Sequence, residues 1–382
     1  MTSTSTTSAL LPVYAQFPLR AVSGHGSWIV DEHGQRWLDA YGGHAVASTG
    51  HSHPHVVEAI ARQAKELLFY STVLPHHNRE LLAEKLVGHM PGGLGHAFFC
   101  NSGAEANENA MTLARKRTGR TKIVSVQGGW HGRTVACLAV TDGAKYEAGA
   151  IRAGMALSPK VPFNDVAALA RFIDDETAAL IVEPVQGMSG ARDCSREFLH
   201  AAREACTRHG AALIFDEIQC GTGRLGTFSA AEFYGVAADA VTMAKGLGSG
   251  FPIAAIVVSD FLADGVTTGD LGSTFGGGPL ACAAGIATLE VMERERLFEN
   301  AAAVGALLRE AAIGMGLGVQ GHGLLLGLRL GRPAGEVQKK LFERRILTGT
   351  ASDPEILRLL PPLTFSRQEA ELLVTGLRTA LA

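Results

Sequence analysis

Residues 211–250 decide the fold, and they read AALIFDEIQCGTGRLGTFSAAEFYGVAADAVTMAKGLGSG. Two short apolar runs in this stretch, residues 211–215 and 240–244, are followed directly by Asp216 and Lys245. Apolar runs of this length bounded by glycine are typical of buried strands in a parallel sheet. Ligands bind beyond the carboxyl ends of such strands in open α/β sheets, so both charged residues are predicted to face one ligand.

An acid and an amine at two strand ends fit pyridoxal 5'-phosphate. A carboxylate such as that of Asp216 can keep the cofactor's ring nitrogen protonated, which the ring needs in order to accept electrons. The cofactor's aldehyde requires a lysine amine, and desolvation is expected to lower the pKa of Lys245 and make it nucleophilic. We therefore expect Asp216 and Lys245 to be the catalytic pair.

The same stretch also permits an interpretation from another functional class. A hydrophobic strand followed by Asp-Glu is found in nucleotide-binding ATPases, which also require G-x-x-x-x-G-K-[ST] upstream. The sequence contains no such string. Residues 221–226 match G-x-G-x-x-G, but residues 216–220 separate this match from its strand, which weakens it as a dinucleotide motif. A nucleotide-binding ATPase is kept as the alternative from another class.

Composition excludes several classes of protein. The chain has 382 residues, of which 47% are hydrophobic and 19% charged, as in an ordinary globular protein. The formal net charge is −3 and there is no basic block, so nucleic acid is not an expected partner. No apolar run reaches membrane-spanning length, so no membrane contact is expected.

The cysteines and the first residues bear on localisation. Six cysteines are scattered without a C-x-x-C pair, which favours unpaired thiols in a reducing compartment. The opening residues 2–8 are of low complexity, and we expect the first residues to be disordered. They lack the apolar core of a signal peptide, and no arginine precedes Arg20. A cytoplasmic protein is expected.

The pattern along the chain predicts two domains. Strand-like and helix-like segments alternate from about residue 80 to 265, which predicts a large doubly wound α/β domain over residues 51–278. From residue 279 to 382 the pattern changes to long helices with short strands, which predicts a smaller α+β domain. Residues 1–50 are expected to pack with this small domain. The alternating His51, His53 and His55 are interrupted by Pro54 and lie in no strand pattern, so we expect a turn and no metal.

A second candidate site is an anion-binding turn at residues 101–108, which read NSGAEANE. A strand over residues 96–100 precedes it and a helix follows. Free backbone N–H groups at the helix start, its positive dipole end and the Ser102 hydroxyl are suited to bind a phosphate. Simple capping of the helix by Asn101 or Ser102 is the alternative.

Further charged and aromatic residues follow other predicted strands. Glycines flank Trp130 and Arg133, where an indole can stack on a planar ring and an arginine can bind a carboxylate. Glu183 follows the apolar residues 179–182. Arg358 lies among apolar residues before a diproline and needs an anion, which Glu183 or a substrate carboxylate can supply.

With these pieces, the chain from about residue 15 to its end resembles the subgroup III, or ornithine-type, aminotransferases, and within them the acetylornithine branch. The resemblance implies the fold type I of pyridoxal-phosphate-dependent transferases. It rests on eight motifs: GHSHP at 50–54, NSGAEANE at 101–108, WHGRT at 130–134, EPVQG at 183–187, DEIQ at 216–219, AKGL at 244–247, STFGG at 273–277 and LRLLPPL at 357–363.

The resemblance implies a role for each matching residue at the cofactor. Lys245 holds the cofactor and moves the proton, Asp216 pairs with the ring nitrogen, and Gln219 reaches the ring hydroxyl. Trp130 stacks on the ring, where the family more often has Phe or Tyr. The phosphate loop is formed by Ser102, Gly103 and Ala104, where many relatives have Gly-Thr in place of the last two.

The resemblance also implies a homodimer with shared sites. Thr274, with Ser273 beside it, reaches the phosphate and the substrate of the neighbouring subunit. Arg133 binds the α-carboxylate of the amine donor. Arg358 binds the α-carboxylate of glutamate, and Glu183 is a movable screen that neutralises Arg358 while the donor is bound.

The implied reaction is a two-step transamination in arginine biosynthesis. N2-acetyl-L-ornithine gives its δ-amine and leaves as N-acetylglutamate 5-semialdehyde, and 2-oxoglutarate then takes the amine and leaves as glutamate. N-succinylornithine, or another acylated diamine such as a lysine-pathway intermediate, is the alternative donor. His44 stands where close relatives carry an apolar residue, so the acyl group stays open. Gly278 stands where relatives often carry Asn.

Overall fold

The large part of the molecule is built on one seven-stranded sheet. The computed structural model describes residues 9–382, so the disorder expected for the first residues falls mostly on residues 1–8, outside the described part. The sheet order is β4-β12-β11-β10-β7-β5-β6. Only β12 runs antiparallel to its neighbours, which confirms the mostly parallel sheet. The strands are β4 Leu94–Cys100, β5 Lys122–Val126, β6 Lys160–Val161, β7 Thr177–Val182, β10 Ala212–Asp216, β11 Ala240–Met243 and β12 Ala254–Ser259.

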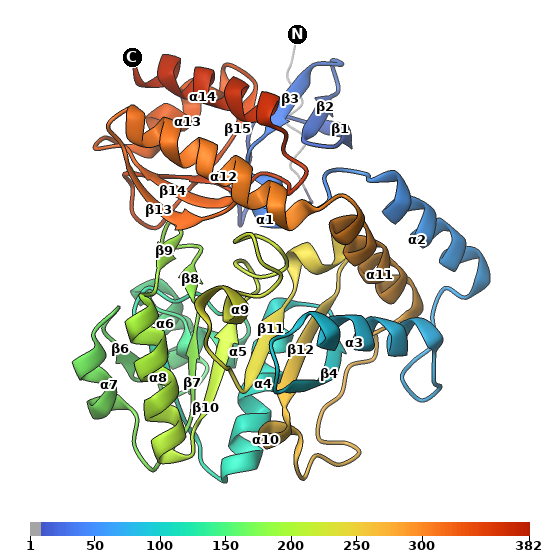
Figure 1. Cartoon of the computed structure of the whole chain (residues 1–382), viewed down its shortest axis with the longest axis vertical. Coiled ribbons are helices and arrows are strands. Elements are labelled where there is room, and N and C mark those ends of the chain that lie inside the picture. Colours follow the sequence, from blue (N-terminus) through green and yellow to red (C-terminus); the bar gives the residue numbers. More distant parts are fainter. Residues whose placement is uncertain (1–8) are drawn as a thin grey trace.

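The central strands are buried on both faces because helices cover each side (Figure 1). In β10, Ala212 and Ile214 belong to the core cluster that contains α4, whereas Leu213 and Phe215 belong to the cluster that contains α8. A doubly covered strand therefore reads as a continuous apolar run. The helices of this part are α2 Pro54–Glu66, α3 His77–His89, α4 Gly103–Thr118, α5 Val135–Val140, α6 Ala144–Arg152, α7 Val166–Phe172, α8 Arg196–His209, α9 Ala230–Tyr234 and α10 Asp260–Ala263.

The chain after residue 278 forms a second group of elements, drawn in orange and red in Figure 1. Helix α11 packs against α2 and α3 and leads into α12. A four-stranded sheet of order β13-β14-β17-β16 follows, with α12 and α13 beside it and α14 packed against these two helices. The elements are α11 Pro279–Arg294, α12 Leu297–Gly314, β13 Gly318–His322, β14 Leu325–Arg329, α13 Ala334–Phe342, β15 Ile346–Leu347, β16 Gly349–Thr350, β17 Ile356–Leu359 and α14 Arg367–Leu381.

The N-terminal strands lie beside this second group. Strand β3 pairs in parallel with β15, so residues 36–39 join the C-terminal part although more than 300 residues separate them (Figure 1). The domain boundaries at residues 50 and 278 stay a prediction. The remaining short elements are β1 Ala21–His25, β2 Trp28–Asp31, β3 Arg36–Asp39, α1 Gly42–Ala45, β8 Val185–Gln186, β9 Arg192–Asp193 and the 3₁₀ turn η1 Lys245–Gly248.

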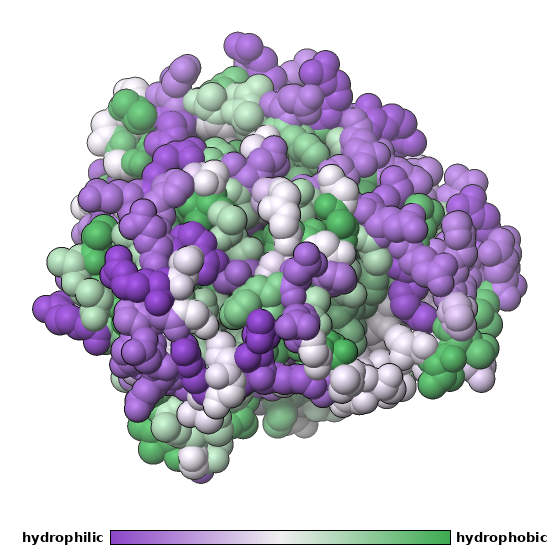
Figure 2. Space-filling model, turned by 60° about the horizontal axis from the view of Figure 1, so that its bottom comes forward, coloured by the Kyte–Doolittle hydropathy of each residue, from purple (hydrophilic) through white to green (hydrophobic). Residues whose placement is uncertain are grey.

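The surface shows hydrophilic residues over much of the face in Figure 2, with hydrophobic residues in separate patches. In the part that the structure describes, no helix combines the length and apolar character needed to cross a bilayer. The six cysteines are all buried and free. The three histidines considered for a metal pair with separate carboxylates: His51 with Asp39, His53 with Glu295 and His55 with Glu290.

Candidate active site

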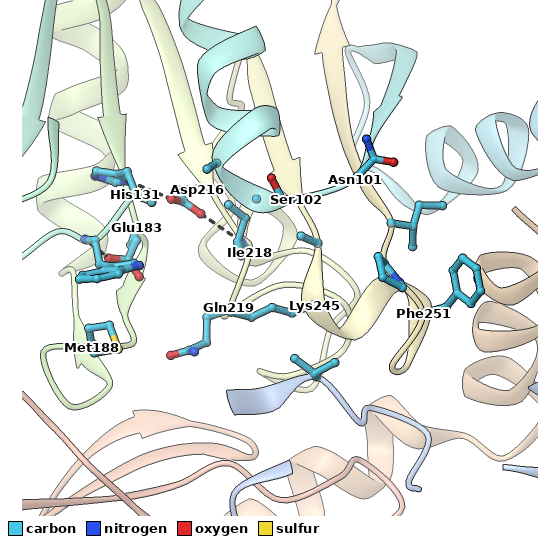
Figure 3. Close-up of a pocket in the computed structure, with 18 of the residues that line it drawn as sticks. Asn101, Ser102, His131, Glu183, Met188, Asp216, Ile218, Gln219, Lys245 and Phe251 are labelled. Carbon is cyan, nitrogen blue, oxygen red and sulfur yellow. Dashed lines mark hydrogen bonds and ion pairs between the residues drawn. The ribbon is translucent and has the colours of Figure 1, made fainter. Parts of the chain in front are cut away.

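A cavity of about 350 Å³ lies at the carboxyl ends of the central strands. Figure 3 shows side chains from several loops converging on it. It brings together most of the predicted site residues, namely Ser102, Gly103, Ala104, Trp130, Glu183, Asp216, Gln219 and Lys245. The other four, Arg133, Ser273, Thr274 and Arg358, do not line it.

Asp216 is the last residue of β10 and is held from three sides. Its Oδ2 accepts hydrogen bonds from Asn107 Nδ2 and His131 Nδ1, both at 2.8 Å. Its Oδ1 accepts from the Ile218 amide at 3.1 Å, and Figure 3 marks this bond and the one from His131. The Thr242 hydroxyl donates to Asn107 Oδ1, which turns the Asn107 amino group toward Asp216. The carboxylate is 2% exposed, so its position is fixed while it remains a hydrogen-bond acceptor.

Lys245 follows the neighbouring strand β11, whose Thr242 is in register with Asp216. Burial lowers the pKa of Lys245, and the nearby Asp216 and Glu183 carboxylates oppose that shift. Its backbone is left-handed, with φ +46°. A non-glycine residue in this region is strained, and such strain concentrates at functional sites. The lowered pKa makes the amine easier to deprotonate and therefore a better nucleophile.

The start of α4 forms the anion-binding end of the cavity. Ser102 Oγ accepts from the Glu105 amide at 3.3 Å, so Ser102 caps the helix as the alternative interpretation expected. The amides of Gly103 and Ala104 have no partner in the described residues. A Cβ on Gly103 would lie 2.6 Å from Ile218 Cδ1, so any larger residue would require the Ile218 side chain to move. The capped helix therefore still offers two free amides to an anion.

Trp130 and Arg133 interact with each other as well as with their surroundings. Trp130 lines the cavity and meets Tyr146 edge-on, with ring centroids 4.6 Å apart. The exposed Arg133 guanidinium lies 5.1 Å from the centroid of the Trp130 ring and 5.5 Å from that of Tyr146. The arginine is thus held by two aromatic faces beside the cavity. The stacking of Trp130 on a cofactor ring stays a prediction.

Glu183 and Arg358 do not form the expected ion pair in this structure. Glu183 accepts from the amides of Trp130 (2.6 Å) and Gly187 (3.1 Å). Arg358 donates to the carbonyls of Thr350 (2.7 Å) and Gly187 (3.0 Å). Both side chains form hydrogen bonds with the backbone instead of with each other. Gly187 joins them, because its amide donates to Glu183 and its carbonyl accepts from Arg358. Burial, and secondarily the Asp216 charge, raises the pKa of Glu183 to about 7.

Gln219 lines the cavity, whereas Ser273 and Thr274 lie outside it. Gln219 Oε1 is buried and has no hydrogen-bond partner among the described residues, so it can accept a hydrogen bond from a ligand. Ser273 Oγ accepts from Asn101 Nδ2 (3.0 Å) and from the Gly276 amide (3.1 Å). Thr274 is exposed. Neither Ser273 nor Thr274 lines the cavity of its own chain.

The structure also decides against the nucleotide-binding interpretation. Glu217 accepts hydrogen bonds from the Ser229 hydroxyl and from the amides of Ala230 and Ala231, so it caps α9 instead of binding a metal. In the G-x-G-x-x-G match, Arg224 is buried and donates to carbonyls of the C-terminal part. The helix that follows the match, α9, has its first amides bound by Glu217, so they are not free for a phosphate.

Comparison with known proteins identifies the family. The family model described as aminotransferase class-III matches residues 12–381. The chain belongs to the class-III aminotransferases. It is 40% identical to acetylornithine aminotransferase of Mycolicibacterium smegmatis (96% of this chain, 95% of the relative) and 39% identical to that of Methanocaldococcus jannaschii (96% and 94%).

Solved structures agree with this family. Ornithine aminotransferase from Toxoplasma gondii superposes with a TM-score of 0.90 at 28% identity, covering 98% of this chain and 92% of that one. A thermostable (S)-enantioselective omega-transaminase from Thermomicrobium roseum gives 0.87 at 30% identity (98% and 96%). Class-III aminotransferases depend on pyridoxal phosphate. The cavity fits this group, because it combines a fixed carboxylate, an amine, two free amides and an unpartnered amide oxygen.

Two residues that hold Asp216 were missed by sequence reasoning. Asn107 and His131 lie inside the quoted NSGAEANE and WHGRT motifs, but no role was predicted for either. Asn has a low helix propensity, so an Asn within the predicted helix is the signal that could have found Asn107. His131 gave no comparable signal, since its partner lies 85 residues away.

Proposed function

We propose that this aminotransferase moves the δ-amine of N2-acetyl-L-ornithine to 2-oxoglutarate, giving N-acetylglutamate 5-semialdehyde and glutamate in arginine biosynthesis. The supporting observation is that relatives named acetylornithine aminotransferase match nearly the whole chain, together with a cavity that contains Asp216 and Lys245. N-succinylornithine, or another acylated diamine, is the second candidate donor.

The cofactor supplies an electron-accepting ring when bound. Asp216 holds a proton at the ring nitrogen, and its three hydrogen-bond donors keep it oriented. Lys245 would hold the cofactor, and its Nζ, whose pKa is lowered by burial, would take up and hand on the proton that the donor's δ-carbon loses. The free amides of Gly103 and Ala104 would hold the phosphate, and Gln219 Oε1 would accept a hydrogen bond from the ring hydroxyl.

Two arginines are proposed to orient the substrates. Arg133, exposed beside Trp130, binds the α-carboxylate of the donor. Arg358 binds the α-carboxylate of 2-oxoglutarate or glutamate. Since Glu183 and Arg358 each bond to the backbone of Gly187, we propose that Glu183 screens Arg358 through this residue. One pocket can then accept first an ω-amine and later a dicarboxylate.

We further propose a homodimer in which Thr274, with Ser273 beside it, completes the partner's site. Phe275 is 63% exposed, and its ring centroid lies 5.0 Å from that of Phe69, which is also exposed. Further exposed apolar residues surround Phe69, namely Leu67, Leu68, Tyr70, Val73 and Leu74. An apolar surface of this kind is typical of a subunit interface. The six free, buried cysteines support a reducing compartment, the cytoplasm, as its location.

Steady-state kinetics of both half-reactions test the proposal. With 2-oxoglutarate as acceptor, acetylornithine and succinylornithine are compared as donors, with 4-aminobutyrate as an amine that has neither acyl group nor α-carboxylate. We expect kcat/KM for an acylated ornithine to exceed that for 4-aminobutyrate by at least 100-fold, about 3 kcal/mol. The Lys245→Ala variant, which binds cofactor without the covalent link, is the inactive control. Equal values for all donors would contradict the proposed donor.

A further inference from the structure

The turn that carries Lys245 is strained at both of its ends. Residues 245–248 form the 3₁₀ turn η1 directly after β11. Lys245, which opens the turn, has φ +46°, and Ser249, which closes it, has φ +45°. Non-glycine residues keep a left-handed backbone only where the surrounding structure holds them there. The turn therefore depends on contacts from outside itself.

Two consecutive residues of the N-terminal part, Ser48 and Thr49, supply such contacts. Ser48 Oγ donates to the Gly246 carbonyl at 2.6 Å, although 198 residues separate them. The Thr49 amide donates to Ser249 Oγ at 3.0 Å, and the hydroxyls of Thr49 and Ser249 lie 2.6 Å apart. Ser48 and Thr49 are each 1% exposed, so water does not compete for these bonds. The pair thus holds both halves of the strained turn.

The contact between Ser48 and Gly246 is a close one. Inside the turn, the Gly246 carbonyl also accepts from the Ser249 amide, but at 3.3 Å. Shorter hydrogen bonds are generally stronger, so the bond from Ser48 dominates at this oxygen. A Cβ at Gly246 would lie 3.3 Å from Ser48 Cβ, which is a tight contact. The glycine next to the lysine therefore gives Ser48 the space to approach.

Ser48 also bonds to the C-terminal segment that contains Arg358. The Ser48 carbonyl accepts from the Leu363 amide at 2.8 Å. Leu363 is the last residue of the LRLLPPL segment, in which Arg358 is the second. The buried Arg224 guanidinium donates to the Pro361 carbonyl and thereby fixes the middle of this segment. One residue is thus bonded on one side to the lysine turn and on the other to a fixed segment.

We propose that Ser48 and Thr49 are positioning residues that hold the Lys245 turn in its strained form, and that Ser48 fixes this turn relative to the segment carrying Arg358. Neither residue lines the active cavity, so both act through the turn. This inference rests on the role proposed for Lys245. Because that amine is needed in both half-reactions, a displaced turn should slow both of them.

Single-turnover kinetics of the holoenzyme, expressed per bound cofactor, test this role. Ser48→Ala removes the donor to Gly246. We expect its maximal rate to fall about tenfold with N2-acetyl-L-ornithine and with L-glutamate alike. Thr49→Val keeps the amide bond to Ser249 and should show a smaller loss. The substrate concentration at half-maximal rate should change by less than about twofold, because neither residue contacts the substrate.

Amide hydrogen exchange gives a second readout that does not depend on activity. In the full-length chain without cofactor, the amides of Leu247, Ser249 and Phe251 are the ones bonded within the turn. They should exchange about tenfold faster in Ser48→Ala, because the turn then opens more often. Amides of the neighbouring strand β10 should change by less than about twofold, which separates local opening from global unfolding.

Matched variants isolate the hydrogen bonds. Thr49→Ser keeps the hydroxyl and should retain the wild-type values in both measurements. Ser27 is 2% exposed, and its hydroxyl has no partner among the described residues. Ser27→Ala therefore removes an equally buried hydroxyl without breaking a bond, and it should leave both the single-turnover rates and the exchange of the turn unchanged.

The outcomes separate this inference from the proposed function. If Ser48→Ala leaves the exchange of the turn unchanged, the inference is wrong. It is also wrong if the exchange rises while both single-turnover rates stay at the wild-type value, since Ser48 then only stabilises the fold. A loss confined to one substrate contradicts it as well. If the wild type reacts with L-glutamate but with neither acylated ornithine, the proposed donor fails, and the rates with L-glutamate still decide the positioning role.

Discussion

Glu183 and Glu217 are two buried carboxylates at the ends of neighbouring strands, β7 and β10. Burial raises the pKa of each to about 7. The Glu217 carboxylate accepts hydrogen bonds from the Ser229 hydroxyl and from the amides of Ala230 and Ala231, and it thereby caps helix α9. Glu183 bonds to loops that line the cavity. A raised pKa therefore does not by itself identify a functional acid. The location of the acid's hydrogen-bond partners distinguishes the two: those of Glu183 lie in loops at the cavity, and those of Glu217 lie at the start of a helix.

The largest expected effect comes from comparing Asp216 with Glu217, which are adjacent in the chain but have different roles. Asp216→Asn keeps the shape but leaves a neutral amide at the ring nitrogen, facing the donors of Asn107 and His131. We expect kcat to fall by at least 10³-fold, about 4 kcal/mol, because the proton on the ring is no longer held. Cofactor absorbance and single-turnover rates measure this. The matched variant Glu217→Gln should keep kcat within about threefold of the wild-type value. A large loss of kcat in this variant would show that Glu217 is not merely structural.

The pH dependence of stability gives the second test. The pKa of Glu217 rises from an ordinary value of 4.5 to about 7 because of burial, so the folded state keeps a proton that the unfolded state releases between these values. Stability contributed by this group is therefore greatest at low pH and falls as the pH rises through that window, by up to about 3 kcal/mol. Above pH 7 the contribution is constant.

Denaturant unfolding of the holoenzyme at pH 5 and pH 8 measures this effect. Glu217→Gln cannot titrate and leaves at least one α9 amide or the Ser229 hydroxyl without an acceptor, which costs about 1–3 kcal/mol at both pH values. The variant should therefore be less stable overall and should lose less stability than the wild type between pH 5 and pH 8. Parallel losses in the two proteins would show that Glu217 does not titrate in this range.

The sequence predicted the strand ends well because that signal is local. The runs before Asp216 and Lys245 are short, apolar and bounded by glycine, and they form β10 and β11. Asp216 is the last residue of β10 and pairs with Thr242 of β11, which confirms the carboxylate predicted at the end of this strand. The start of α4 at Gly103 also followed from local signals, the Ser-Gly step and the acidic first turn.

The rest could not be predicted because it depends on contacts between distant parts of the chain. Tyr41 and Arg358 are 317 residues apart in the sequence, yet the Arg358 guanidinium donates to Tyr41 Oη. The ion pair expected between Glu183 and Arg358 is absent because Gly187 bonds to both, which no spacing reveals. A sequence can suggest which opposite charges pair. It does not show which backbone groups compete for the same side chains, because that depends on the folded structure.

The smallest expected effect is on donor selectivity, and it concerns Glu183 itself. Glu183→Gln keeps one acceptor for the amides of Trp130 and Gly187 but removes the charge that screens Arg358. We expect the ratio of kcat/KM for the acylated donor to that for glutamate to fall by about three- to tenfold, with cofactor affinity unchanged. The loss should fall on the donor half-reaction, because an unscreened Arg358 attracts the donor's carboxylate to the wrong end. If both half-reactions keep their rates, Glu183 is a structural acid like Glu217, and orientation depends on Arg133 alone.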